Sequence, residues 1–225
     1  MAEDTDPPRY ASAPCFAHEL ADGVQGFVTV DPQQARDVAR WRKAERERLI
    51  AARLAVPADE RAQVADQVGR ALDRIVPHGA GTVVSLFWPF RGELDLRGWM
   101  TRAAGRGTCI ALPVVVGRDR PLIFRAWQPG CAMQRGVWNI PQPADGENLI
   151  PDIVIAPLVG YDARSYRLGY GGGFFDRTLA AMQDRPTVIG VGHETAAIPT
   201  IFPQPHDIPM DVILTGADAG QAGEP

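Results

Sequence analysis

The chain has 225 residues, of which 45% are hydrophobic and 22% charged, and it carries a net charge of −4 at neutral pH. These values are typical of a packed soluble protein and exclude a disordered chain. Its three cysteines, Cys15, Cys109 and Cys131, have no C-x-x-C spacing, so they predict neither a disulfide framework nor a zinc site. We therefore expect a reducing, cytoplasmic location. Because no membrane-spanning run and no signal-peptide pattern occurs, we expect no membrane association.

The predicted elements begin with two helices. Asp31 followed by Pro32 is typical of a helix start, and the first helix is predicted to end near residue 55. The second is predicted over 58–76, where apolar residues recur at helical spacing. The segments at both ends of the chain lack sustained periodicity. The expected division is an N-terminal extension over 1–30, one domain over 31–215 and a tail over 216–225.

Short apolar runs follow the two helices, and several are continuously hydrophobic, as strands buried on both faces should be. They cover residues 82–88, 109–116, 122–127, 152–159, 187–192 and 211–215. Further helices are predicted at about 94–105 and 174–184. Strands that alternate with helices predict an α/β layer fold with a mostly parallel sheet. The runs 109–116 and 122–127, joined by GRDRP, are predicted to form a hairpin at its side.

A glycine-rich segment, RLGYGGGFFDR, extends from Arg167 to Arg177 and leads into the helix predicted over 174–184. Glycines at a helix N-terminus let backbone N–H groups approach an anion, and the helix contributes partial positive charge. The segment is therefore predicted to hold a phosphate, although it matches neither the Walker A nor the G-x-G-x-x-G pattern. The alternative is a tight connection in which Asp176 complements the helix dipole.

The first predicted helix is rich in arginine and contains Lys43, the chain's one lysine. Arg42 and Arg46 share a helix face, so their guanidinium groups can converge on one polyphosphate. The alternative is a solvated charged face. Because the protein is acidic overall and no aromatic ladder accompanies the helix, we expect no nucleic-acid partner.

Carboxylates and aromatic residues stand at three further places. Asp207 lies in a proline-rich loop before the last predicted strand, where a carboxylate facing phosphates could bind Mg²⁺ or serve only as a turn residue. Glu93 follows the first predicted strand, close to Trp88, and Trp138 lies between turn-forming residues. Exposed aromatic rings beside one carboxylate suit a flat heterocycle with N–H donors, whereas core packing is the alternative.

Together, RLGYGGGFFDR, WNIPQP, HDIPMD, Glu93 and the basic helix resemble the 5-formyltetrahydrofolate cyclo-ligase family, also called methenyltetrahydrofolate synthetases, over about residues 38–215. The resemblance implies an ATP- and Mg²⁺-dependent ligase that converts 5-formyltetrahydrofolate to 5,10-methenyltetrahydrofolate, ADP and phosphate. It implies phosphorylation of the formyl oxygen followed by closure of N10 on the activated carbon. It also implies a three-layer Rossmann-like sandwich, similar to the ribose-phosphate isomerase and CoA-transferase group, with a reduced folate as partner, in a monomer or homodimer.

The resemblance also assigns roles to residues. The implied ATP contacts are Arg42, Lys43, Arg46, Arg167, Leu168, Gly169, Tyr170, Gly171, Gly172, Gly173, Phe174 and Phe175. The implied folate contacts are Trp88, Glu93, Trp138, Tyr170 and Phe174. The implied magnesium ligands are Asp176 and Asp207, and the implied catalytic residues are Glu93, Arg167 and Asp176. Two alternatives remain, a divergent paralogue that binds folate and nucleotide without turnover and an isomerase of sugar phosphates on the same scaffold.

Overall fold

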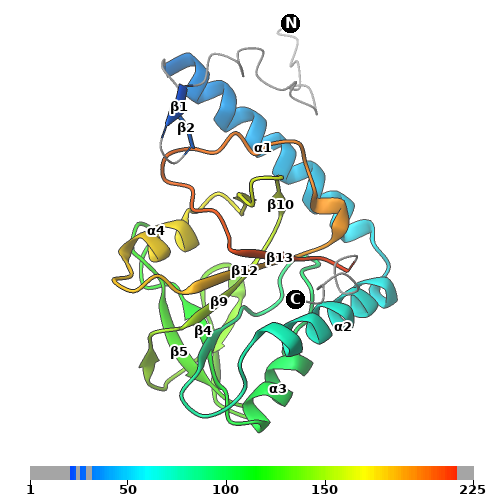
Figure 1. The fold of residues 1–225 in the computed structure, drawn as a ribbon, viewed down its shortest axis with the longest axis vertical. Coiled ribbons are helices and arrows are strands. Elements are labelled where there is room, and N and C mark those ends of the chain that lie inside the picture. Colours follow the sequence, from blue (N-terminus) through cyan, green and yellow to red (C-terminus); the bar gives the residue numbers. More distant parts are fainter. Residues whose placement is uncertain (1–20, 24–25, 29–31, 217–225) are drawn as a thin grey trace, which may run out of the picture.

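The computed structural model describes residues 21–23, 26–28 and 32–216. Most of the expected N-terminal extension and residues 217–225 of the expected tail lie outside the described residues. Within the extension, β1 (Ala21–Gly23) and β2 (Gly26–Val28) pair as an antiparallel hairpin. The remaining elements belong to the predicted domain (Figure 1).

A mixed sheet of seven strands forms the centre of the domain, in the order β13-β12-β9-β3-β4-β5-β8. The strands from β13 to β4 are parallel, whereas β5 is antiparallel to both of its neighbours, β4 and the edge strand β8. This arrangement confirms the predicted α/β class and the predicted hairpin of β4 and β5. The strands are β3 (Val83–Ser85), β4 (Cys109–Val114), β5 (Ile123–Trp127), β8 (Asn148–Leu149), β9 (Ile153–Pro157), β12 (Thr187–Val191) and β13 (Val212–Leu214).

Helices cover both faces of this sheet. On one face, α2 (Ala58–Ile75) and α3 (Arg97–Gly105) pack on a core that includes Ile110 and Leu112 of β4. On the other face, α4 (Phe174–Ala181) packs beside Ala111 of the same strand. Because successive side chains of a strand point to opposite faces, β4 supplies both cores, and its continuous apolar run is explained.

The long helix α1 (Pro32–Ala55) packs on neither face of the sheet. It lies across loops beyond the sheet, where Leu49 joins a separate core with Leu168 and Ile201 (Figure 1). The short pair β10 (Gly160–Tyr161) and β11 (Arg167–Leu168) belongs to the same region. The arginine-rich helix α1 therefore packs against the glycine-rich segment and against the loop that contains Ile201.

A second hairpin joins β6 (Met133–Arg135) to β7 (Pro141–Pro143). Its tip is a single 3-10 turn, Val137–Asn139, in which Trp138 and Asn139 adopt φ of 55° and 61°. Left-handed backbone is rare for such residues and is kept only where surrounding contacts support it. At this tip the Trp138 ring lies beside the rings of Phe90, Tyr170 and Phe174.

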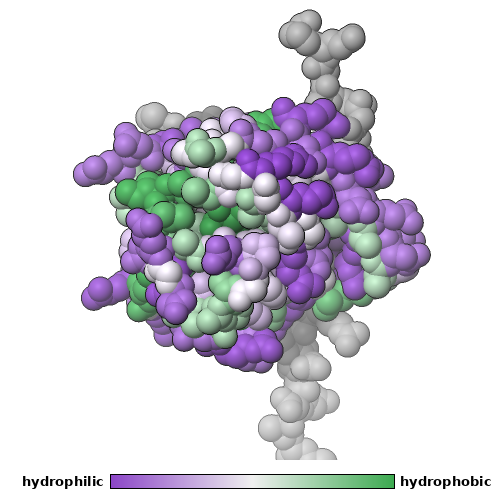
Figure 2. Space-filling model, turned by 90° about the horizontal axis from the view of Figure 1, so that it is seen from below, coloured by the Kyte–Doolittle hydropathy of each residue, from purple (hydrophilic) through white to green (hydrophobic). Residues whose placement is uncertain are grey.

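The face shown in Figure 2 is mostly hydrophilic, and its most prominent apolar patch lies at the left side. In the part of the chain that the structure describes, no helix is both long and apolar enough to cross a bilayer.

Several predicted boundaries are wrong by a few residues. The strand predicted over 82–88 ends at Ser85, the helix predicted over 94–105 begins at Arg97, and the helix predicted over 174–184 ends at Ala181. The apolar run beyond Ser85 continues in Leu86, which is fully buried although it lies outside the sheet. An apolar run reports burial and therefore cannot mark where a strand ends.

Candidate active site

The site lies where the connections of the sheet reverse direction. β3 continues through α3 on one face to β4, whereas β9 continues through α4 on the other face to β12, and β3 and β9 are neighbours. A crevice outside the carboxyl ends of the strands is the usual ligand site at such a switch point. Trp88 follows β3 and Pro157 ends β9, and both residues line pockets at this place.

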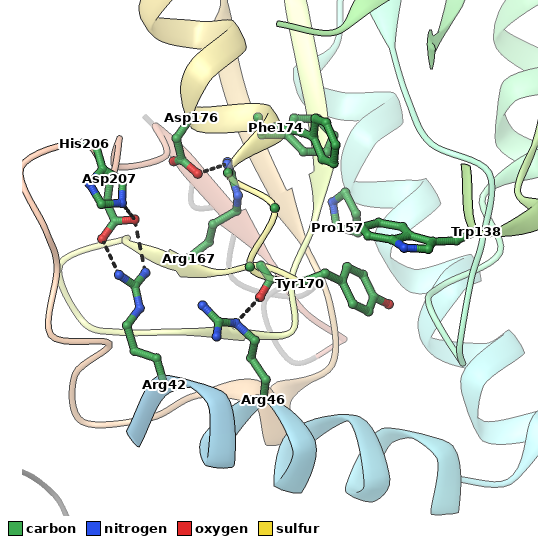
Figure 3. A pocket seen from close by; sticks show the side chains of 15 residues that line it. Arg42, Arg46, Trp138, Pro157, Arg167, Tyr170, Phe174, Asp176, His206 and Asp207 are labelled. Atoms are coloured by element: carbon green, nitrogen blue, oxygen red, sulfur yellow. Dashed lines mark hydrogen bonds and ion pairs between the residues drawn. The ribbon is translucent and has the colours of Figure 1, made fainter. Parts of the chain in front are cut away.

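A polar pocket of about 160 Å³ opens between α1, the glycine-rich loop and the loop before β13 (Figure 3). The side chains that give it its charge are those of Arg42, Arg46, Arg167, Asp176 and Asp207. The sequence predicted that Arg42 and Arg46 share a helix face, and the structure confirms that both line this pocket.

Two ion pairs, one buried and one partly buried, build its walls. Arg42 of α1 donates from Nη1 and Nη2 to the two carboxylate oxygens of Asp207, at 3.0 and 3.1 Å. Arg167 donates from Nη2 to Oδ2 of Asp176 at 2.9 Å. Both arginines are more than nine-tenths buried. The pairs join the basic helix to the loop before β13 and the glycine-rich loop to α4, so segments far apart in sequence form one wall.

The arginines retain donors that no described residue uses. Nε of Arg42 and Nη1 of Arg167 are buried and have no hydrogen-bond partner among the described residues. Arg46 donates from Nε to the carbonyl of Gly169 at 2.7 Å. Burial, with the nearby Arg42, lowers the pKa of Arg46 to about 10, so it stays charged at neutral pH. Unused buried donors are costly, and Arg42 and Arg167 keep hydrogen-bonding capacity that the described residues do not meet.

The glycine-rich loop has the backbone that the sequence predicted for close approach. Gly171 has φ of +92°, and a Cβ added there would lie 3.3 Å from Cζ of Arg46. Gly173, at φ of +62°, immediately precedes α4. At these positions a side chain would strain the backbone, and at Gly171 it would also press on the arginine. The first N–H groups of α4 lack intrahelical acceptors and add partial positive charge here.

An apolar pocket of about 120 Å³ adjoins the polar one. The two share one wall, made by Trp138, Pro157, Tyr170, Phe174 and Phe175. Within that wall the Trp138 ring is half exposed and lies parallel to the Phe90 ring, with centroids 6.4 Å apart. Figure 3 shows Trp138, Tyr170 and Phe174 at the end of the polar pocket that is away from Asp207.

Glu93 lines the apolar pocket and is the carboxylate that the sequence predicted there. Its Oε2 accepts a hydrogen bond from the Phe90 backbone N–H at 2.9 Å. Burial raises the pKa of Glu93 to about 7, although the positive charge of Arg53 opposes the rise. A carboxyl group that titrates near neutral pH is suited to exchange a proton with a ligand.

Most residues assigned from the sequence line one or both pockets. The exceptions are Lys43, whose side chain is exposed, and Leu168, which is fully buried in the core beneath α1. Sequence reasoning assigned no role to Arg53, Pro157 or His206, although Pro157 and His206 line the pockets. His206 begins the HDIPMD motif and Arg53 belongs to the arginine-rich helix, but no local pattern distinguishes either residue, or Pro157, from its neighbours.

The metal prediction stays a prediction. Asp176 and Asp207 face the polar pocket, and each carboxylate already pairs with an arginine. Across the described ranges, no group of three or more His, Cys, Asp or Glu side chains could hold a metal ion. A cation here would therefore need ligands from a bound molecule as well as from these two residues.

The fold and the joined pockets define an α/β protein in which a pocket lined by charged side chains adjoins a pocket lined by aromatic and apolar side chains. A family model described as the 5-formyltetrahydrofolate cyclo-ligase family matches residues 38–216. The chain therefore belongs to this family of enzymes, as predicted from its motifs.

Individual relatives agree with this assignment. A 5-formyltetrahydrofolate cyclo-ligase from Escherichia coli K12 is 28% identical over 170 residues, covering 72% of this chain and 93% of that protein. One from Haemophilus influenzae is 28% identical over 140 residues, covering 59% and 75%. A solved 5,10-methenyltetrahydrofolate synthetase from Aquifex aeolicus has a TM-score of 0.65 at 25% identity, covering 78% of this chain and 89% of that chain. One from Mycoplasma pneumoniae has a TM-score of 0.62 at 19% identity, covering 78% and 98%, and supports the fold alone.

Proposed function

We propose that this protein converts 5-formyltetrahydrofolate and ATP to 5,10-methenyltetrahydrofolate, ADP and phosphate. The observation that carries the proposal is the shared wall, because it joins a pocket suited to phosphates to a pocket suited to a flat ring. A reaction between a phosphoryl group and a ring substituent needs both ligands to meet, and positioning supplies much of the catalysis in such transfers.

The polar pocket fits the triphosphate of ATP. Arg42 and Arg167 offer the buried donors that lack partners, and Arg46 adds a third positive charge. Gly171 and Gly173 let the loop backbone approach the phosphate oxygens. Anions are bound in this way by backbone N–H groups and guanidinium groups at a helix N-terminus.

The apolar pocket fits a reduced pterin with its aryl amine. Trp138 and Phe90 offer parallel aromatic faces, and Trp88 lies on the same pocket. Glu93 supplies an acceptor for an N–H group at its edge. A mostly apolar lining with few convergent polar groups is typical of a site that orients a ring system.

Magnesium suits the chemistry of this donor set. Mg²⁺ in nucleotide sites takes one or two carboxylates together with phosphates and waters, and Asp176 and Asp207 are the residues that would hold it. When bound, the ion neutralises negative charge on the phosphates. Asp176 accepts hydrogen bonds from Arg167 and from the Ile208 backbone, which leaves acceptor capacity on its carboxylate.

The proposed reaction has two steps. The formyl oxygen attacks the γ-phosphorus of ATP, and the bond from that phosphorus to the β-phosphate oxygen breaks to release ADP. N10 then attacks the activated formyl carbon, the carbon–oxygen bond breaks, and phosphate leaves with the former formyl oxygen. The N10 proton must also leave, and the Glu93 carboxylate is suited to accept it because its pKa is about 7. Arg42, Arg46 and Arg167 stabilise the charge on the transferred group.

The test is the near-ultraviolet absorbance of methenyltetrahydrofolate. Purified protein is mixed with 5-formyltetrahydrofolate, ATP and Mg²⁺, and reactions without ATP and without Mg²⁺ run beside it. Absorbance that grows only in the complete mixture, and is lost in Asp176→Asn, supports the proposal. Absorbance that does not change with folded protein would contradict the proposal and favour the paralogue without turnover. Binding of ATP and of folate by that protein would then identify the paralogue.

A further inference from the structure

The turn that carries Glu93 has an unfavourable backbone. Arg91 and Gly92, the two residues before Glu93, adopt φ of 47° and 76°. Left-handed backbone at a non-glycine residue is disfavoured by about 1–2 kcal/mol and persists only where outside contacts hold it. Within the turn, the Glu93 N–H donates to the Phe90 carbonyl at 3.1 Å. This contact closes the turn but leaves the carbonyl of Arg91 to be held from elsewhere.

Arg53, near the end of α1, supplies that outside contact. Its Nε donates to the Arg91 carbonyl at 2.9 Å. Its Nη1 donates to the Leu158 carbonyl at 3.0 Å, and its Nη2 donates to the Tyr170 hydroxyl. The side chain is 6% exposed, so one buried guanidinium joins α1 to the Glu93 turn, to the loop after β9 and to the glycine-rich loop.

The charge of Arg53 matters as well as its geometry. All three hydrogen bonds go to uncharged oxygens, and Glu93 is a carboxylate on which the Arg53 charge acts. A buried guanidinium is costly without an opposite charge nearby. The positive charge therefore favours the ionised form of Glu93, and Glu93 in return offsets the buried charge.

Other polar groups surround the same turn. Tyr170, from the glycine-rich loop, donates from its hydroxyl to the Phe90 carbonyl at 3.3 Å, and burial raises the pKa of that hydroxyl, which stays protonated. His193, which follows β12, faces the Gly92 carbonyl, and burial lowers its pKa so that it is neutral at physiological pH. Arg61, Arg91 and Asp95 line a cavity beside the same turn. Of the charged groups in the described residues, Arg53 is the one whose charge lowers the pKa of Glu93.

We propose that Arg53 is a positioning residue that holds the Glu93 turn and the Tyr170 side chain against each other, so that an ionised Glu93 faces the apolar pocket. Arg53 does not line either pocket and therefore acts through these two residues. Its role in catalysis rests on the proposed function, because it acts through Glu93.

Two substitutions separate geometry from charge. Arg53→Gln removes the charge and shortens the side chain, whereas Arg53→Lys keeps the charge but cannot make three forked hydrogen bonds. Arg40→Met is the matched control, because Arg40 lies on the same helix, is 71% exposed and pairs with Asp37 at 2.8 Å. Thermal unfolding establishes that each variant is folded.

The first readout is the titration of Glu93, followed by NMR of ¹³C-labelled glutamate carboxyl groups and assigned with Glu93→Gln. We expect its midpoint to move to higher pH in Arg53→Gln and to stay at the wild-type value in Arg40→Met. An unchanged midpoint in Arg53→Gln would overturn the proposal. This readout needs no turnover, so it decides the role of Arg53 even if wild-type protein forms no methenyltetrahydrofolate and the proposed function fails.

The second readout is kinetic. We expect kcat/KM for the folate to fall on the order of 100-fold in Arg53→Lys, while the KM for ATP stays near the wild-type value. In Arg53→Gln the acidic limb of the pH–rate profile should also move to higher pH. If kcat/KM in Arg53→Lys equals the wild-type value, the proposal is overturned, even if Arg53→Gln does not fold. A residue that only stabilised the fold would change neither the KM values for the two substrates nor the pH–rate profile.

Discussion

The buried pair of Arg42 and Asp207 allows a quantitative prediction. Its two hydrogen bonds, at 3.0 and 3.1 Å, lie between side chains that are only 9% and 7% exposed. Removing one partner leaves the other charge buried without compensation, which costs about 3–5 kcal/mol. For a domain of this size, that loss lowers the melting temperature by roughly 6–20 °C. We therefore expect Arg42→Met and Asp207→Leu each to destabilise the protein strongly.

The assay is a double-mutant cycle in urea. Arg42→Met combined with Asp207→Leu removes both charges, so we expect it to be far less destabilising than the sum of the single substitutions. The pair of Arg40 and Asp37, on the same helix and with the arginine 71% exposed, is the control and should give a coupling of about 0.2–1 kcal/mol. A coupling for Arg42 and Asp207 that is no larger than this control value would refute the reasoning that burial makes the pair strong.

Three further predictions concern the pockets. Gly171→Ala should raise the KM for ATP while leaving that for folate nearly unchanged, because its Cβ meets Arg46 and its φ is +92°; equal effects on both substrates in steady-state kinetics would contradict this. Trp138→Ala should weaken folate binding by roughly tenfold, about 1.4 kcal/mol, by removing the ring parallel to Phe90, as measured by fluorescence titration. Because folding raises the pKa of Glu93 from 4.5 to about 7, wild-type stability should fall as pH rises through this range, and Glu93→Gln should abolish the fall in urea unfolding; the same slope in both proteins would count against a buried, weakly acidic Glu93.

The layers of the fold could be predicted from the sequence because they follow from periodicity. The helix predicted over 58–76 corresponds to α2, Ala58–Ile75, whose apolar stripe faces the sheet. The hairpin of β6 and β7 could not be predicted, because strands of three residues are too short to show an alternating pattern and β7 begins and ends with proline. The left-handed turn at its tip also depends on tertiary contacts of Trp138.

The charged half of the site was also accessible from the sequence, since helix spacing places Arg42 and Arg46 on one face and glycines mark the loop. Their pairing partners were not accessible. Asp207 lies 165 positions from Arg42 in the chain, and only the fold brings the two together. Arg53 was equally hidden, because its three acceptors are two backbone carbonyls and one hydroxyl, which leave no sequence pattern.

The central claim is that the two pockets bring the formyl oxygen of the folate to the γ-phosphoryl group of ATP. The most direct measurement uses 5-formyltetrahydrofolate labelled with ¹⁸O in the formyl group, with mass analysis of the phosphate after one turnover. We predict that the label appears in inorganic phosphate in an amount equal to the methenyltetrahydrofolate formed. Methenyltetrahydrofolate that forms while the label appears in water would contradict the account.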